Sequence, residues 1–403
     1  MKIRSKFASI ILVILFLFLP FSSWLVSYFK NNNISLLRDG LVLLIICLAI
    51  PNFFDMIKRK KIYTASTLTT ILFILYGLVS YFWREASVEQ WLRGFRFTFL
   101  PIVMFLSIYS FEFDPKQRLS ILRSVLISGV AVIIIGILEY FHIRLPLGEG
   151  QSNLGAIQEF QYIESTNILR LQSVLAGPNA FALYLLALIS YIVGSFKEIN
   201  QKLIYLTIPA IILLVLTFSR SVLFGLIALI AGYCCIFIFK KFNKQKAWLI
   251  IILSFSLSIA IGLSIYSNYR EQPLVTHNTS TNLRTIQYER IWETRNEIGL
   301  WGRGLGTAGP ASQYRLDGGE NHWTENIYFD IFEDLGLIGL LIYIALLTTI
   351  ILSLIKGSVQ KNLTAFLAII SFIVAGFFIN NYTGQAGIFL VWLAAGMARA
   401  KTE

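Results

Sequence analysis

Charged residues are scarce in this sequence, and so are the residues that build disulfide frameworks and metal sites. Only 14% of the 403 residues are charged, whereas a soluble domain typically has about 25%. There are three cysteines and three histidines. Cys47, Cys234 and Cys235 all fall within apolar runs, where cysteine behaves as a small apolar residue. The composition therefore excludes an ordinary soluble domain and a disulfide-stabilised scaffold.

Long apolar runs dominate the sequence, since 56% of its residues are hydrophobic and the mean hydropathy is +0.69. A helix needs about 20 apolar residues to cross a bilayer. The runs are continuous rather than alternating, which favours helices over the strands of a barrel. The sequence thus predicts an all-α polytopic membrane protein with about twelve transmembrane helices. These spans lie at about 7–29, 36–55, 63–82, 94–112, 120–141, 171–194, 203–218, 221–239, 248–267, 336–356, 362–380 and 386–398.

The basic residues differ in type between the two sides of the membrane that these spans imply. Fifteen of the nineteen on the side that holds both termini are lysine, and lysine-rich loops lie in the cytoplasm. Thirteen of the fourteen on the other side are arginine. The planar arginine fork binds phosphate or carboxylate through two parallel hydrogen bonds and keeps its charge. The sequence therefore predicts cytoplasmic termini and an anionic, phosphorylated ligand at the outer face.

The net charge of +12 does not indicate a nucleic-acid partner, because most basic residues lie in short loops between spans. The whole chain, 1–403, is predicted to be one membrane domain. Two outer loops, at about 142–170 and 268–335, are long enough to be functional. The second contains three tryptophans and four tyrosines, so it is predicted to fold into an outer cap with short amphipathic helices.

Within the longer loop, the segment from Arg284 to Ile298 has partial helical spacing of apolar residues. This spacing predicts an amphipathic helix that lies along the membrane surface. Its arginines either anchor it to lipid headgroups or bind the ligand. Gly302, Gly304 and Gly306 follow, and such glycines form a tight turn or let the backbone approach a partner helix or a phosphate.

Three further residues are candidates for the site. Arg220 lies between two spans with almost no loop, and a charge at that depth faces the protein interior or snorkels to the headgroups. Glu325 is a candidate general base near the arginine-rich helix. Alternatively, Thr324 caps the next helix and Glu325 only complements its dipole. If that helix begins early, one turn brings His322 to the same face as Glu325.

The order of these motifs resembles the O-antigen ligase and polymerase superfamily of bacterial polysaccharide assembly. The resemblance covers about 170–345 in motifs and the whole chain in topology. Its motifs are Gly177-Pro178-Asn179 at the start of a span, Thr217-Phe218-Ser219-Arg220 between spans, Trp301-Gly302-Arg303-Gly304-Leu305-Gly306, and Glu325-Asn326-Ile327-Tyr328.

The resemblance implies an inverting glycosyltransferase of the bacterial cytoplasmic (inner) membrane. Its donor would be an oligosaccharide on undecaprenyl diphosphate, transferred to an acceptor hydroxyl at the outer face. It would need neither a nucleotide sugar nor a metal or other cofactor, and a chain-length regulator would be a further partner. Glu325 or His322 would be the catalytic base. The pyrophosphate and substrate would be bound by Arg220, Arg284, Arg290, Arg303 and Asn326.

Glu325 distinguishes two members of that superfamily. Ligases typically carry His-Asn where this chain has Glu325-Asn326, which favours a polymerase. A ligase that joins the glycan to lipid A-core or another acceptor is the alternative. A transporter or flippase is less favoured, because the sequence has no internal repeat and most span-associated charges lie near span ends rather than at the midplane.

Overall fold

The computed structural model describes the chain with several gaps. The described residues are 2–31, 33–58, 64–145, 161–163, 168–241, 278–314, 322–357, 359, 362–380, 382 and 385–399. The ninth expected span, 248–267, therefore lies outside the described residues. Among those described, helices dominate, and the two short strands form one antiparallel pair. The all-α prediction is confirmed.

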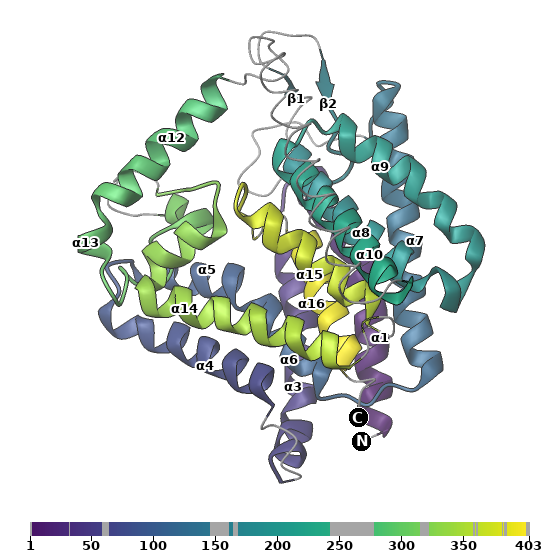
Figure 1. Cartoon of the computed structure of the whole chain (residues 1–403), viewed down its shortest axis with the longest axis horizontal. Coiled ribbons are helices and arrows are strands. Elements are labelled where there is room, and N and C mark those ends of the chain that lie inside the picture. Colours follow the sequence, from purple (N-terminus) through teal and green to yellow (C-terminus); the bar gives the residue numbers. More distant parts are fainter. Residues whose placement is uncertain are drawn as a thin grey trace.

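The first part of the chain forms a series of helices. Short 3-10 helices extend two of them. The elements are α1 (Lys2–Phe18), η1 (Leu19–Phe21), α2 (Ser22–Phe29), α3 (Ile34–Lys58), α4 (Ala65–Val79), η2 (Ser80–Trp83), α5 (Val88–Thr98), α6 (Leu100–Tyr109) and α7 (Pro115–Tyr140). Helix α7 is upright at the right of Figure 1, and α4 is oblique at its lower left.

The second part contains a small hairpin and then further helices. Both termini lie at the bottom of Figure 1, away from α12 and the hairpin. The elements are β1 (Gln161–Tyr162), β2 (Leu169–Arg170), α8 (Pro178–Ile199), η3 (Gln201–Leu206), α9 (Thr207–Leu216), α10 (Arg220–Lys241), α12 (Asn278–Glu293), α13 (Arg295–Ile298), η4 (Gly309–Tyr314), α14 (Ile327–Lys356), α15 (Leu363–Gly376) and α16 (Gln385–Arg399).

The helices are those of a polytopic membrane protein. Among the described residues, seven helical segments are long and apolar enough to cross a membrane, or eight if the bent pair of α5 and α6 is one span. Three expected spans appear as shorter apolar helices, Gln201–Leu216, Leu363–Gly376 and Ala386–Ala398. The count of twelve therefore stays a prediction.

The centre of the bundle is α8. Every residue from 181 to 192 is buried, and a helix that is apolar on all sides belongs in a core. It packs against α7, α9, α15 and α16, while α10 packs on α15 and α14 on α4. This arrangement holds the N-terminal end of α8 beside the junction between α9 and α10.

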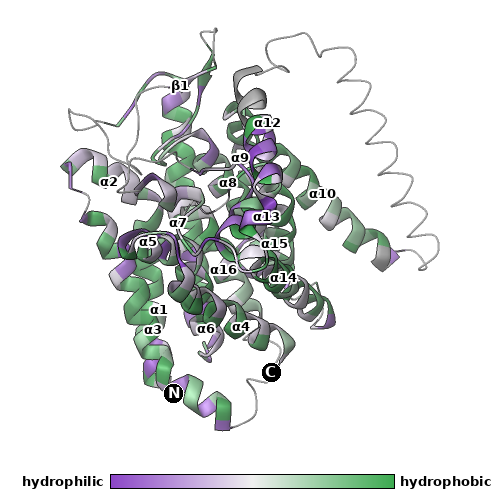
Figure 2. Cartoon of the chain, turned by 90° about the vertical axis from the view of Figure 1, so that its left-hand side faces the viewer, coloured by the Kyte–Doolittle hydropathy of each residue, from purple (hydrophilic) through white to green (hydrophobic). Residues whose placement is uncertain are grey.

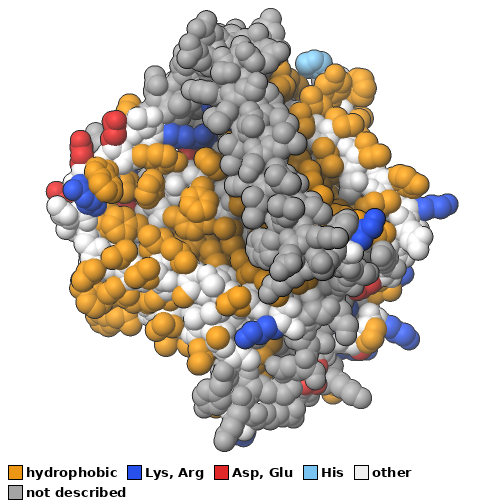
Figure 3. Space-filling view, in the orientation of Figure 1, with side chains coloured by type: hydrophobic (Ala, Val, Ile, Leu, Met, Phe, Trp, Pro, Cys, Tyr) orange, Lys and Arg blue, Asp and Glu red, His pale blue; other side chains and the backbone are white. Residues whose placement is uncertain are grey.

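Large apolar side chains also cover much of the outside. They occupy most of the described surface in the view of Figure 3, where charged side chains are few. Phe82, Phe54 and Leu92 are 82%, 61% and 57% exposed. Hydrophilic residues gather instead on α12 and α13 (Figure 2). An apolar exterior of this extent matches a lipid environment.

The helix α14 begins earlier than the sequence predicts, at Ile327 rather than near 336. A break at Gly336, with φ of 67° and ψ of −171°, divides it. The sequence marks this glycine as a boundary, whereas the chain is helical on both sides of it. The first helical part lies within the outer loop expected over 268–335, whose limits stay a prediction.

Candidate functional site

The helix α12 carries two arginines toward the rest of the molecule. Gln287 and Ile291 lie three and seven residues after Arg284, on the same face, and Ile291 is only 3% exposed. Trp292, the next residue, is 69% exposed. The expected single helix over 284–298 is also divided in two, because α12 ends at Glu293 and α13 begins at Arg295.

Arg284 forms an ion pair with Glu325. Its Nε donates a hydrogen bond of 2.5 Å to Glu325 Oε2, and its Nη2 donates one of 3.3 Å to the Ser221 hydroxyl. The side chains of Arg284 and Glu325 are 23% and 32% exposed. The amide of Glu325 donates to Gln287 Oε1 at 3.3 Å. A partly exposed ion pair is held in place by α12, α10 and the segment before α14.

Arg220 is the first residue of α10 and lies next to Ser221. It interacts electrostatically with both Arg284 and Glu325. The preceding turn is tight, with Phe218 at a φ of 52° and the Ser219 amide bonded to the Thr217 hydroxyl at 3.2 Å. This turn brings the cation at the start of α10 to the pair formed by α12 and the segment before α14.

A fourth charged residue at this place, Arg170, was not singled out by the sequence. Its Nε donates to the Thr217 carbonyl at 3.1 Å, and its Nη2 donates to Asn179 Oδ1 at 3.4 Å. Burial lowers the pKa of the Arg170 guanidinium, the Glu325 carboxylate raises it and Arg220 lowers it. Arg170 therefore interacts electrostatically with the same carboxylate as Arg220. We call Arg170, Arg220, Arg284 and Glu325 the arginine cluster.

A second group of charges lies around Glu333, whose side chain is 1% exposed. Arg290 binds both of its carboxylate oxygens, at 2.9 and 3.3 Å. His322 Nδ1 lies 2.6 Å from Oε1, and Arg303 lies 4.0 Å away while also pairing with Glu297. Two arginines thus face two carboxylates and one histidine. We call this set the Glu333 cluster.

The helix α14 begins at a capping residue different from the one expected. Asn326 Oδ1 accepts the amides of Tyr328 and Phe329, at 2.9 and 3.3 Å, so Asn326 is the N-cap. Thr324 instead donates its hydroxyl proton to Asp330 at 2.6 Å. His322 and Glu325 both precede the helix, so the expected placement on one helical turn is wrong. Each binds a different arginine-containing cluster.

The glycine-rich segment lies against protein backbone. Gly302, Gly304 and Gly306 have φ of 76°, 91° and 92°. A Cβ on Gly304 would overlap the Arg84 backbone, and one on Gly302 would overlap the Gly336 amide. The amides of Arg303 and Gly304 bond the carbonyls of 333 and 334 at 2.9 Å. Gly306 meets the Gln90 carbonyl of α5, so close packing against α14, α5 and the residue after η2 accounts for these glycines.

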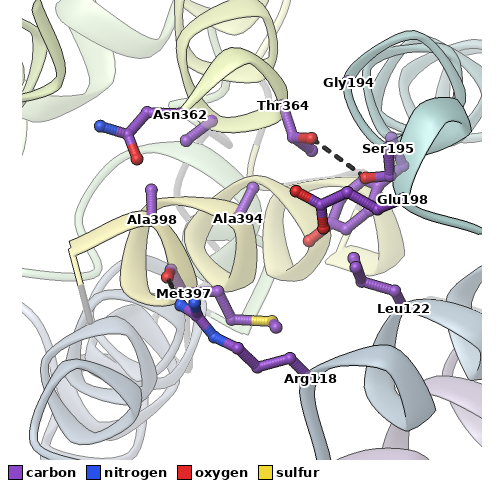
Figure 4. A pocket seen from close by; sticks show the side chains of 12 residues that line it. Arg118, Leu122, Gly194, Ser195, Glu198, Asn362, Thr364, Ala394, Met397 and Ala398 are labelled. Atoms are coloured by element: carbon purple, nitrogen blue, oxygen red, sulfur yellow. Dashed lines mark hydrogen bonds between the residues drawn. The ribbon is translucent and has the colours of Figure 1, made fainter. Parts of the chain in front are cut away.

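A cavity of about 50 Å³ lies at the other end of α8 (Figure 4). Arg118, Glu198, Asn362 and Met397 line it, and Ser195 and Thr364 bond across it at 3.2 Å. Ligand pockets typically measure about 300–1,000 Å³. This cavity is too small for a glycolipid, and none of the predicted site residues lines it.

Among the residues that the structure describes, no three His, Cys, Asp or Glu side chains gather as they do around a metal ion. The two clusters bring together guanidinium groups, three carboxylates and one imidazole. Such groups bind anions and move protons.

Residues 205–344 match the family model described as O-antigen ligase. This part of the chain is therefore similar to O-antigen ligases. The described helices are those of a multi-pass membrane protein. No curated protein matches the chain. The matched region runs from η3 into α14 and includes all the predicted site residues.

The residues predicted for the site, all within the matched region, are divided between both clusters. Arg220, Arg284 and Glu325 join the arginine cluster, whereas His322, Arg290 and Arg303 join the Glu333 cluster. Asn326 caps α14 next to Glu325 and donates to the Phe377 carbonyl at 3.1 Å. Arg170 lies before the matched region. The one signal that pointed to it was its place among the arginines of the predicted outer side, shortly before Gly177-Pro178-Asn179.

Proposed function

We propose that this enzyme polymerises glycan repeat units that are linked to undecaprenyl diphosphate, at the outer face of the inner membrane. The observation that carries the proposal is the arginine cluster, in which three guanidinium groups act on one carboxylate. A leaving diphosphate needs fixed positive charge where its negative charge develops. The cluster supplies that charge on three separate elements, β2, α10 and α12.

The reaction is an inverting displacement. The acceptor hydroxyl oxygen attacks the anomeric carbon, the bond from that carbon to the diphosphate oxygen breaks, and the diphosphate leaves with the electron pair. Glu325 takes the proton of the attacking hydroxyl. The new glycosidic bond lengthens the chain by one repeat unit.

Glu325 has a second role before the donor binds. Its carboxylate pairs with Arg284, the group that would hold the diphosphate. A diphosphate carries more charge than a carboxylate, so it competes for the same guanidinium. Donor binding therefore releases Glu325 from Arg284 and leaves it beside the reaction centre as a base.

The Glu333 cluster holds together the elements that carry the site. Glu333 is buried and Arg290 occupies both of its oxygens, so this pair fixes α12 to α14. Arg303 and His322 hold the adjoining loop to the same carboxylate. His322 is the alternative base, because its bond to Glu333 orients the imidazole as carboxylates do in hydrolytic triads.

The second candidate function is that of a ligase, and the description of the matched family favours it. One assay separates the two. Purified protein receives a single undecaprenyl-diphosphate-linked repeat unit with no other acceptor, and the products are resolved on a gel. A polymerase makes a ladder of lipid-linked chains, and Arg220→Ala makes none. Product formation only after lipid A-core is added would establish the ligase.

A further inference from the structure

The junction between α9 and α10 has an arginine from another element on each side of it. On one side, the Thr217 carbonyl, directly after α9, accepts a hydrogen bond from Arg170 at 3.1 Å. On the other side, the Ser221 hydroxyl, in the first turn of α10, accepts one from Arg284 at 3.3 Å. Arg220, the first residue of α10, lies between these two positions in the chain. Arg170 and Arg284 thus contact the chain on either side of Arg220, and we call these three arginines the arginine row.

The charges act on each other in the same order. Arg220 interacts with both Arg284 and Glu325, and Arg170 interacts with Arg220 and Glu325. Glu325 is thus the carboxylate that this row of cations shares. One phosphate can be held by two guanidinium groups, whereas two linked phosphates extend over a longer row.

We propose that Arg170 binds the donor diphosphate together with Arg220 and Arg284, and that it makes the site select a diphosphate over a monophosphate. This inference rests on the proposed function. Arg284 and Arg220 hold one phosphate, and Arg170 holds the other at the far end of the row. The released carrier lipid is later dephosphorylated to the monophosphate. That monophosphate then binds too weakly to block the site.

The hydrogen bonds of Arg170 explain how a hairpin residue can serve in this way. Its Nη2 donates to Asn179 in the first turn of α8, and its Nε donates to the Thr217 carbonyl. These two bonds hold the guanidinium at the junction between α9 and α10 through Nε and Nη2, and the proposal assigns Nη1 to the ligand. The Leu171 amide also bonds the Leu216 carbonyl at 3.3 Å, which fixes the backbone next to Arg170.

The test compares two lipids that differ by one phosphate. The full-length protein in nanodiscs is titrated with undecaprenyl diphosphate and with undecaprenyl monophosphate, and the dissociation constants are measured by microscale thermophoresis. Wild type is expected to prefer the diphosphate. Arg170→Ala is expected to weaken diphosphate binding by about tenfold or more and to change monophosphate binding by less than about twofold. Arg284→Ala is expected to weaken both.

Three further variants separate binding from structure. Arg170→Gln keeps an amide that can donate to Thr217 but removes the charge, so it should lose diphosphate preference while the protein stays folded. Arg170→Lys keeps the charge and should recover part of the preference. Arg295→Ala removes an exposed arginine that stacks on Trp292, and it should bind both lipids like wild type.

The outcomes distinguish this inference from the proposed function. If Arg170→Gln lowers the affinity for both lipids equally, or for neither, the proposed role of Arg170 is overturned. The proposed donor site is not affected by that result. If wild type binds neither lipid and Arg220→Ala transfers glycan normally, the proposed function itself is wrong.

Discussion

Arg284 and Arg290 lie six residues apart on α12, yet their carboxylate partners differ in exposure. The Glu325 side chain is 32% exposed, and that of Glu333 is 1% exposed. A partly exposed pair can exchange its carboxylate for an anionic ligand at low cost. A buried pair cannot be separated without leaving a charge in a medium that solvates it poorly. Of these two arginines, Arg284 therefore serves ligand binding and Arg290 serves the stability of the fold.

Arg290→Ala is expected to destabilise the protein, because it leaves the Glu333 carboxylate buried without its bidentate partner. Breaking such a pair typically costs about 3–5 kcal/mol. Thermal unfolding in detergent should show a clearly lower midpoint. Adding Glu333→Gln to Arg290→Ala removes the stranded charge and should restore part of the loss.

Arg284→Ala is the matched control on the same helix. It should change the unfolding midpoint little, since Glu325 stays accessible to water, while it weakens donor binding. Equal destabilisation by both substitutions would mean that the two pairs have the same structural role.

Glu325→Gln is expected to separate binding from chemistry. The amide cannot accept the proton of the acceptor hydroxyl, so transfer should fall by about 10²–10⁴-fold. It also no longer competes for Arg284, so undecaprenyl diphosphate should bind more tightly than to wild type. Weaker binding would show that Glu325 positions Arg284 for the donor.

His322→Ala provides the comparison for the choice of base. If Glu325 is the base, this variant should keep far more transfer activity than Glu325→Gln, and its main effect should be lower stability through Glu333. The reverse order of the two activities would assign the base to His322.

At the scale of single elements, the break in α14 shapes the region between the clusters. The segment from 299 to 304 lies against the break, and the amides of Leu337 and Ile338 bond the carbonyls of 299 and 300 at 3.2 Å. These bonds replace those that the helix loses at Gly336. The break therefore ties the glycine-rich loop to the helix that begins beside Glu325.

Gly336→Ala should destabilise this element strongly. A Cβ there would overlap the Leu300 carbonyl and the Gly302 amide, and φ is +67°. Backbone strain of about 1–3 kcal/mol is expected in addition to the overlap. Gly40→Ala is the matched control, because nothing lies within 4 Å of its Cβ. The midpoint of thermal unfolding should fall for Gly336→Ala and stay unchanged or rise for Gly40→Ala. Equal midpoints would contradict the tight packing.

For the whole molecule, the division of lysine and arginine between two sides predicts the orientation in the membrane. The test introduces single cysteines into a variant without Cys47, Cys234 and Cys235. An impermeant maleimide applied to intact spheroplasts should label the Arg295→Cys variant. The Lys116→Cys variant should be labelled only after the spheroplasts are lysed. Labelling in the opposite order would place the arginine cluster in the cytoplasm and remove the outer-face proposal.

The apolar runs determined much of the fold before any packing was considered. Lipid cannot satisfy backbone polar groups, so continuous runs must become helices, and the described runs did so, although α14 begins nine residues before its expected limit. The break at Gly336 was harder to predict from the sequence. Only the contact with Leu300 and Gly302 decides that the chain turns there and continues as a helix, because those residues replace the lost hydrogen bonds.

The sequence by itself also determined which residue types form the site, because phosphate binding calls for arginine and proton transfer for a carboxylate or imidazole. It did not determine their pairing. Arg284 and Glu325 are 41 residues apart, and Arg170 reaches Thr217 over 47. Contacts over such separations depend on how α8, α10 and α12 pack. Only the tertiary structure therefore divided the arginines between an accessible carboxylate and a buried one.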